Sequence, residues 1–166
     1  GARFVLLRDL GSAISPTNAF HIIQGLETLP LRYRVHQENA GRVADFLSER
    51  PEVAEVIYPG LFQNAADRKR NRKYLETGNG PLVGFELKGG KQAGQKFIDN
   101  LQMVYHVANI GDARTLAIHP ASTTHSQLSA IDQEKTGVTP GYVRLSVGLE
   151  HIDDILEDLT QALEKT

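Results

Sequence analysis

Arg144 is the residue whose type and position most suggest chemistry. It lies in the stretch GYVRLSVGLEHIDD, residues 141–154, which otherwise has the pattern of a buried strand. Side chains alternate along an extended chain, so Val143 and Leu145 share one face while Arg144 lies on the other. A guanidinium on a rigid strand could bind a carboxylate or a phosphate through two parallel hydrogen bonds. It could equally mark the solvated face of a sheet covered on one side only, and the pattern alone leaves both interpretations open.

A polar segment, HPASTTHSQ at residues 119–127, is the second candidate. It combines short hydroxyl side chains with His119 and His125, which lie six positions apart across Pro120. That spacing matches no common zinc motif, so we expect structural roles for the two histidines. Hydroxyls of this kind suit a loop that hydrogen-bonds either to itself or to a ligand, and the spacing does not choose between these roles.

Other catalytic motifs are weak or absent. Asp153 and Asp154 are adjacent carboxylates, but with Glu150 they lie at the expected start of a helix, where negative charge stabilises the helix dipole without catalysis. The sequence contains no Walker or dinucleotide glycine loop and no nucleophile elbow. It contains no cysteine, which removes disulfides and thiolate zinc sites, and we expect no metal site.

A run of basic residues raises the question of nucleic-acid binding. The run comprises Arg68, Lys69, Arg70, Arg72 and Lys73. Asp67 and Glu76 flank it, and only Tyr74 offers a stacking ring, so we expect the solvated face of a helix over residues 65–75. A net charge of −2 adds no general attraction for nucleic acid, and we expect no such partner.

Length and composition fit one ordinary globular domain. The chain has 166 residues, of which 40% are hydrophobic and 23% charged. No apolar run approaches the ~20 residues that span a bilayer, and no signal sequence opens the chain. We therefore expect a cytoplasmic protein without a membrane partner.

The elements that would position these residues alternate between helix and strand. Helices are predicted over residues 16–26, 30–50, 65–75, 91–101 and from 152 onward, and strands over 53–58, 82–87, 103–107, 115–119 and 141–147. Alternation of this kind predicts an α/β sandwich, a small mixed sheet with helices on one face and Arg144 on the bare face. Residues 1–10 carry no clear capping or strand signal, which suggests a piece of a larger protein.

Five ordered stretches of the chain resemble one family. They are RDLGSAISPTNAF, QGLETLPLR, VIYPGL, NIGDARTLAIHPASTTHSQL and YVRLSVGLEHIDDILEDL. Together they resemble the C-terminal part of the pyridoxal-phosphate-dependent enzymes of cysteine and methionine metabolism, over essentially the whole chain. The resemblance implies the small C-terminal domain of a fold-type I enzyme, a single domain over residues 1–166. Residues 1–50 would be a helical segment joining a large domain, and residues 51–166 the α/β sandwich.

The resemblance also implies roles for particular residues. The arginine of the family's RLS-x-G motif falls on Arg144 and would bind the α-carboxylate of an amino-acid substrate. Asn109 and Ile110 would lie beside that carboxylate, with Thr124 close by. The family's cofactor lysine lies in an S-x-T-K motif, which none of the lysines of this chain has: Lys69, Lys73, Lys88, Lys91, Lys96, Lys135 and Lys165. Catalytic and cofactor-binding residues are therefore expected outside this chain.

The activity follows from the resemblance alone. The NIGD and HPASTTHSQL segments are most similar to enzymes that convert O-acetylhomoserine and sulfide into homocysteine and acetate, in methionine biosynthesis, and family members are usually homotetramers. The chain alone would be inactive. The alternatives are a cystathionine γ-synthase or a γ-lyase of the same family, or a freestanding non-catalytic domain for amino-acid binding or assembly.

Overall fold

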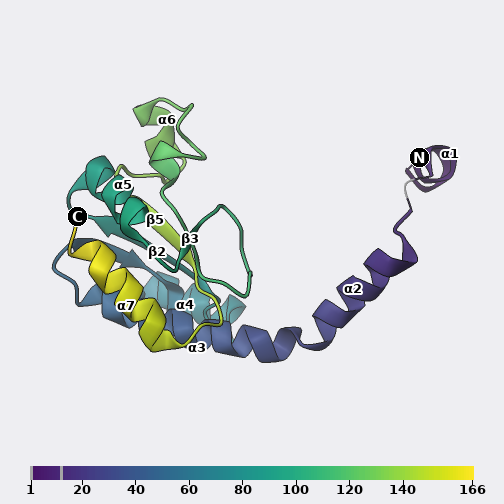
Figure 1. Cartoon of the computed structure of the whole chain (residues 1–166), viewed down its shortest axis with the longest axis horizontal. Coiled ribbons are helices and arrows are strands. Elements are labelled where there is room, and N and C mark those ends of the chain that lie inside the picture. The colour runs from purple at the N-terminus through teal and green to yellow at the C-terminus, as the bar shows by residue number, and fades with distance from the viewer. Residues whose placement is uncertain (1, 12) are drawn as a thin grey trace. The chain divides into compact units, whose positions relative to one another are not determined.

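The computed structural model describes residues 2–11 and 13–166 and divides the chain into two compact units (Figure 1). The first unit is Gly1–Arg32 and the second is Tyr33–Thr166. Two residues lie outside the described residues. Gly1 belongs to the segment 1–10, which carries no clear capping or strand signal, and Ser12 belongs to the stretch RDLGSAISPTNAF. The expectation of one domain with a segment boundary after residue 50 stays a prediction.

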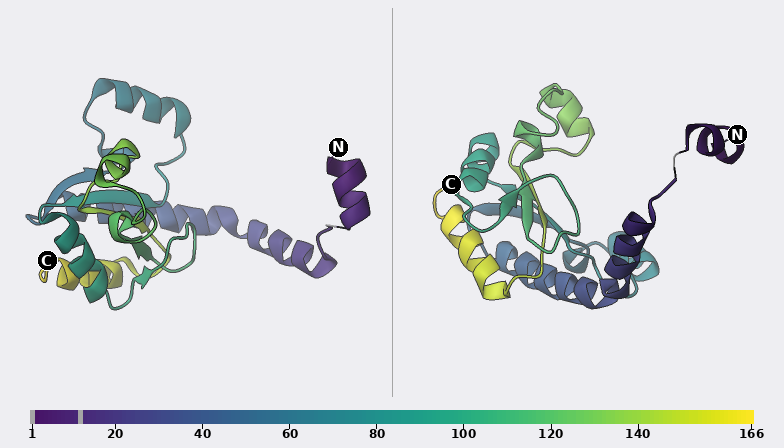
Figure 2. Two further views of the ribbon diagram at one scale, coloured as in Figure 1. Left: turned by 90° about the horizontal axis from the view of Figure 1, so that it is seen from above. Right: turned by 45° about the vertical axis from the view of Figure 1, so that its right-hand side comes forward.

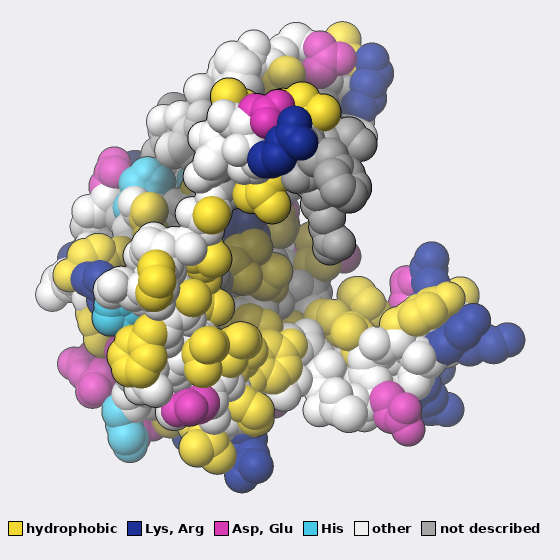
Figure 3. Space-filling model, turned by 90° about the vertical axis from the view of Figure 1, so that its right-hand side faces the viewer, with side chains coloured by type: hydrophobic (Ala, Val, Ile, Leu, Met, Phe, Trp, Pro, Cys, Tyr) yellow, Lys and Arg dark blue, Asp and Glu magenta, His cyan; other side chains and the backbone are white. Residues whose placement is uncertain are grey.

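The first unit is helical. A π-helical turn, η1 (Ala2–Leu7), runs into a short helix, α1 (Arg8–Leu10), in a segment for which no element was predicted. Helix α2 (Pro16–Glu27) begins as predicted, since Ser15 Oγ accepts a 3.1 Å hydrogen bond from Asn18 N. None of the residues of α2 is buried. The helix exposes several apolar side chains, and Figure 3 shows hydrophobic side chains in yellow.

The second unit is built on a five-stranded mixed sheet, which Figure 2 shows from two further directions. The strand order is β1-β2-β5-β4-β3. The strands are β1 (Val53–Ile57), β2 (Leu82–Leu87), β3 (Tyr105–His106), β4 (Leu116–Ile118) and β5 (Tyr142–Ser146). Neighbouring strands are antiparallel except β3 and β4, which are parallel. The mixed sheet predicted from the sequence is confirmed, and β5 lies at its centre.

Five helices follow α2 along the chain. The helices are α3 (Leu29–Ser48), α4 (Ala65–Tyr74), α5 (Gly90–Asn100), α6 (Ala130–Lys135) and α7 (Ile152–Leu163), with short 3-10 turns η2 (Pro59–Leu61) and η3 (Pro120–Ser122). Four of the five match predicted segments to within a few residues. Helix α6 was not predicted, because six residues are too few to show a helical period.

The core lies between the sheet and the helices α3, α5 and α7, which Figures 1 and 2 show on one side of the sheet. Phe85 of β2 and Phe97 of α5 meet edge to face, with ring centroids 5.4 Å apart, and both are fully buried. Val143 and Leu145 of β5 are also fully buried in this layer. The alternation of β5 is therefore confirmed, and Arg144 lies on the opposite face of the sheet.

The strand predicted over residues 103–107 is shorter than expected. Only Tyr105–His106 pairs with β4. The backbone N–H groups of Met103 and Val104 instead donate to Asp158 Oδ2 of α7, each at 2.9 Å. Donors bound to a side chain cannot join a ladder, so the strand begins only after them.

The basic run lies on α4, which buries none of its residues. This agrees with the predicted solvated helix. Of the helices formed by the described residues, none combines the length and the apolar character that a membrane span requires.

Candidate functional site

Arg144 lies on the central strand of the sheet, opposite Gly84 of β2 and Ile118 of β4. Its Nη2 donates to the carbonyl oxygen of Asn109 at 3.3 Å. Its Nε is buried and has no hydrogen-bond partner within the described residues. None of the ion pairs that these residues form involves Arg144. Buried polar atoms nearly always have a hydrogen-bond partner, so the Nε of Arg144 is an exception among the described residues.

The guanidinium opens on a cavity of about 550 Å³ over the bare face of the sheet. The cavity is lined by Ile57, Ala108, Ile118, Pro120, Thr124, His125, Thr136, Gly137, Val138, Tyr142 and Arg144. Arg144 is the one cationic guanidinium or ammonium group in this set. A small anion with an apolar remainder matches such a lining.

Tyr142 shares the face of Arg144 and lies across the neighbouring strand. A Cβ atom on Gly84 would come within 2.6 Å of the Tyr142 hydroxyl, so glycine at this position leaves room for the ring. Burial raises the pKa of the Tyr142 hydroxyl, and the nearby charge of Arg144 partly opposes this shift. Tyr142 therefore forms a neutral, amphipathic wall beside the guanidinium.

The loop that carries Asn109 and Ile110 is fastened to β5. Gly111 N donates to Ser146 Oγ at 3.1 Å, and Gly111 has a positive φ of 78°. Ser146 leaves the same face of β5 as Arg144, which brings the Asn109 carbonyl to the guanidinium. Neither Asn109 nor Ile110 is among the residues that line the cavity, and the Ile110 side chain is 55% exposed.

The polar segment after β4 hydrogen-bonds largely to itself. His119 is buried, with Nδ1 2.8 Å from Ser122 Oγ and Nε2 2.7 Å from the carbonyl oxygen of Pro140. Burial lowers its pKa. Thr124 Oγ1 lies 2.9 Å from His125 Nδ1, and both residues line the cavity. The structure thus brings Thr124 and Arg144 to the same cavity.

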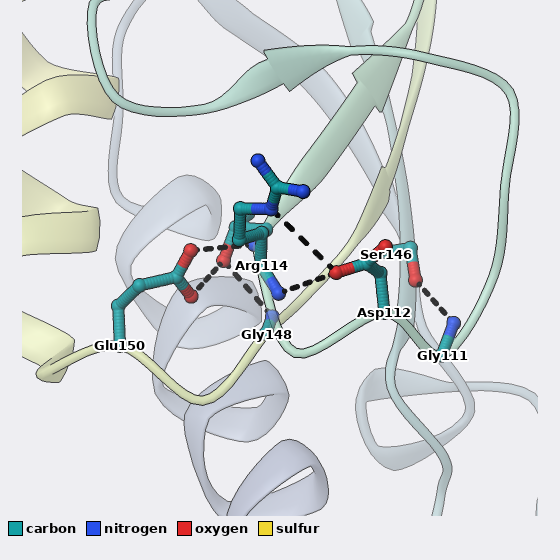
Figure 4. Close-up of polar contacts among 7 residues, drawn as sticks. Gly111, Asp112, Arg114, Ser146, Gly148 and Glu150 are labelled. Atoms are coloured by element: carbon teal, nitrogen blue, oxygen red, sulfur yellow. Dashed lines mark hydrogen bonds and ion pairs between the residues drawn. The ribbon is translucent and has the colours of Figure 1, made fainter. Parts of the chain in front are cut away.

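Glu150 makes a contact with Thr115 that the sequence did not predict. It was expected at the positive end of the last helix with Asp153 and Asp154, which do lie in the first turn of α7. Its carboxylate instead accepts hydrogen bonds from Thr115, from the backbone N at 2.6 Å and from Oγ1 at 2.8 Å (Figure 4). The two residues are 35 positions apart, and no local pattern reveals such a pair.

The residues around Arg144 fit a carboxylate and do not fit pyridoxal phosphate itself. The cofactor needs a lysine for its covalent link, and no lysine lines this cavity. A guanidinium can donate two parallel hydrogen bonds to a carboxylate, and Arg144 brings one to this cavity. Within the described residues, no group of three or more histidine, aspartate or glutamate side chains is placed to hold a metal ion.

Comparisons with known proteins identify the family of this chain. Residues 2–164 match the family model described as "Cys/Met metabolism PLP-dependent enzyme". The chain is 58% identical to the O-acetyl-L-homoserine sulfhydrylase of Leptospira meyeri, 49% identical to O-acetyl-L-homoserine sulfhydrylase 1 of Thermus thermophilus and 42% identical to the L-methionine gamma-lyase of Fusobacterium nucleatum. Each match covers 98% of this chain but only 37%, 38% and 41% of the respective relative.

A solved structure from Campylobacter jejuni, assigned as an O-acetylhomoserine (thiol)-lyase, is also similar. It has a TM-score of 0.88 and 42% identity over 98% of this chain and 38% of its own. That structure carries N'-pyridoxyl-lysine-5'-monophosphate. The chain therefore belongs to the pyridoxal-phosphate-dependent enzymes of cysteine and methionine metabolism, and it spans less than half the length of these relatives.

Proposed function

We propose that this chain is the substrate-binding C-terminal domain of an O-acetylhomoserine sulfhydrylase. The parent enzyme exchanges the acetate group of O-acetylhomoserine for sulfide, giving homocysteine and acetate in methionine biosynthesis. Support comes from the family match and from the two relatives with that name, which are 58% and 49% identical. The chain alone has no cofactor lysine in the family's sequence context and is inactive.

The single observation that carries the substrate-binding role is the guanidinium of Arg144, which lines the cavity on the bare face of the sheet. A substrate α-carboxylate binds there through two parallel charge-assisted hydrogen bonds. Holding the carboxylate at a fixed angle fixes the neighbouring carbon, whose C–H bond must be broken. Thr124 lies on the cavity wall, and Asn109 and Ile110 form the loop beside the guanidinium.

Pyridoxal phosphate, when bound to the parent enzyme, supplies the electron sink for this chemistry. In our proposal the lysine and the phosphate site come from the part of the enzyme outside residues 1–166. The residues of this chain bind and orient the amino-acid end of the substrate. This division explains a cavity that has one guanidinium and no lysine.

The parent enzyme also supplies the partners of this chain. In α2, Phe20, Ile22, Ile23 and Leu26 are each more than half exposed. Exposed apolar surface of this kind is normally covered by another part of a protein. We propose that residues 1–50 join the large domain of the same polypeptide and that the assembled enzyme is a homotetramer in the cytoplasm.

A γ-lyase is the second candidate, because a methionine γ-lyase is 42% identical over 98% of the chain. Both reactions start from an amino acid held by its carboxylate, so the Arg144 cavity serves either. The two reactions differ in their outcome. In the sulfhydrylase reaction sulfide replaces the γ-substituent, whereas in the γ-lyase reaction the γ-substituent leaves and ammonia is released.

The experiment that decides between them uses the full-length parent enzyme. Purified enzyme is given O-acetylhomoserine with sulfide, or methionine alone, and homocysteine, acetate, ammonia and thiol are measured. The proposal predicts stoichiometric homocysteine and acetate from the first mixture and little ammonia from methionine. Rapid release of ammonia and thiol from methionine, with little homocysteine from the first mixture, would establish the γ-lyase instead.

A further inference from the structure

We propose that Glu150 is a positioning residue for Arg144. It fixes, through Thr115, the loop whose Asn109 carbonyl holds the guanidinium, and so sets the direction in which Arg144 meets a carboxylate. The inference rests on the proposed function, since a direction matters only if Arg144 binds the substrate.

The contact between Glu150 and Thr115 is the core of this inference. One carboxylate oxygen accepts from Thr115 N at 2.6 Å, and the other accepts from Thr115 Oγ1 at 2.8 Å. Thr115 is fully buried, so its N–H has no access to water. A carboxylate that accepts from two donors of one residue fixes that residue in place, and charged acceptors make the stronger hydrogen bonds.

Gly148 completes the contact. Its N–H donates to Thr115 Oγ1 at 2.9 Å. A Cβ atom on Gly148 would lie 2.5 Å from the backbone C of Arg114 and from Thr115 N, so only glycine lets the two backbones approach this closely. From α3, Asn39 Nδ2 donates to the carbonyl oxygens of Gly148 and Glu150 at 3.1 and 3.0 Å, which fixes the segment from its other side.

Two further hydrogen bonds extend this attachment toward Arg144. Leu149 N donates to the carbonyl oxygen of Ala113 at 2.7 Å, and Gly111 N donates to Ser146 Oγ at 3.1 Å. Residues 111–115 are therefore fastened along residues 146–150, as Figure 4 shows for Gly111, Ser146, Gly148 and Glu150. Asn109, just beyond this fastened stretch, accepts the hydrogen bond from Arg144. The loop and the guanidinium are thus held by the same continuation of β5.

Helix capping does not account for Glu150. An acidic side chain that serves the helix dipole remains near the first turn of its helix, as Asp154 does in solvent. Glu150 instead reaches a buried threonine at the end of the Asn109 loop. An amide in its place would keep one acceptor and turn an NH2 group toward Thr115, so either the N–H or the O–H of Thr115 would lose its acceptor.

The test uses the full-length parent enzyme with Glu150→Gln, with Thr115→Val as a second variant of similar volume and Asp154→Asn as the matched control. We expect kcat/KM for the amino-acid substrate to fall about three- to tenfold in the first two variants, chiefly through KM. Cofactor absorbance should not change. Asp154→Asn should retain wild-type kinetics. Wild-type KM in both Glu150→Gln and Thr115→Val would overturn the proposal.

A double-mutant cycle with Arg144→Ala separates positioning from general destabilisation. If Glu150 acts through Arg144, Glu150→Gln should change kcat/KM less than about twofold in the Arg144→Ala background. Equal factors in both backgrounds would show that the two residues act independently, and would overturn the proposal.

Hydrogen exchange provides a readout besides activity. The amides of Gly111 and Thr115 should exchange faster in Glu150→Gln than in the wild type, and unchanged exchange would contradict the link. If Arg144→Ala keeps wild-type kcat/KM, the proposed function is wrong, and this inference, which rests on it, is wrong as well. That outcome differs from a failure of the inference alone, in which Arg144→Ala is impaired and Glu150→Gln is not.

Discussion

Arg144 and Ser146 lie two positions apart on β5, so both side chains leave the same face of the sheet, and each contacts the loop of residues 109–111. Arg144 donates to the Asn109 carbonyl, and Ser146 accepts from Gly111 N. One strand thereby holds both the proposed binding group and the loop that contacts it. Most of the guanidinium's donors remain available to a ligand in the cavity.

Asp158 should be among the polar residues on which stability depends most. Its carboxylate accepts the N–H groups of Gln102, Met103 and Val104, each at 2.9 Å, and the residue is 6% exposed. We expect Asp158→Asn to lower the free energy of unfolding by about 1–3 kcal/mol, because an amide offers fewer acceptors and leaves a buried N–H unpaired.

Urea unfolding of the chain measures this effect, with Glu157→Gln on the exposed side of α7 as the matched control. The control should change the free energy of unfolding by less than about 0.5 kcal/mol. Equal losses in the two variants would mean that the three backbone contacts do not carry the effect.

His119 should make stability depend on pH. Burial is the largest cause that lowers its pKa below the ordinary 6.5, and Lys91 and His106 lower it further, while the Pro140 carbonyl and Glu86 act in the opposite direction. The unfolded chain therefore takes up the proton first as the pH falls. The stabilisation from neutral His119 is complete above pH 6.5 and is lost as the pH falls below that value toward the folded pKa.

The measurement is the free energy of unfolding of the wild type and of His119→Gln between pH 8 and pH 5. The difference between the two proteins should shrink as the pH falls. A difference that is constant over this range, or that grows on acidification, would contradict the lowered pKa.

Pyridoxal phosphate should not label any one lysine of this chain specifically. All seven lysines are exposed, and none lines the Arg144 cavity. After incubation with the cofactor and reduction with borohydride, peptide mapping should show adducts spread over several lysines, without one that saturates first. A single lysine labelled stoichiometrically at low cofactor concentration would contradict the division of roles that we propose.

The features that could be predicted from the sequence are those that depend on neighbouring residues. The alternation of Val143, Arg144 and Leu145 predicted which side chain faces the core, and the cap at Ser15 predicted the start of α2. Both features are properties of adjacent residues, so no knowledge of the fold was needed. The proposed site residue Arg144 came from the same pattern together with the family resemblance.

Contacts between distant residues could not be predicted in this way. Glu150 is an acidic residue just before a helix, which is typical of a helix start, yet its partner Thr115 lies 35 positions earlier. Asp158 shortens the strand at Met103, from 55 positions away. In both cases a carboxylate satisfies backbone donors that only the folded chain brings within reach.

The most direct test of the central claim is the catalytic efficiency of Arg144 variants in the full-length parent enzyme, with cofactor absorbance recorded on the same samples. Arg144→Lys keeps the charge but loses the planar pair of donors, so kcat/KM should fall by about one to two orders of magnitude. Arg144→Ala should lose more, because the carboxylate then has no counter-charge. Arg68→Ala, on the exposed helix α4, is the control and should keep wild-type efficiency. The account predicts losses in the order Ala greater than Lys with cofactor absorbance intact, and near-wild-type kcat/KM in Arg144→Ala would contradict it.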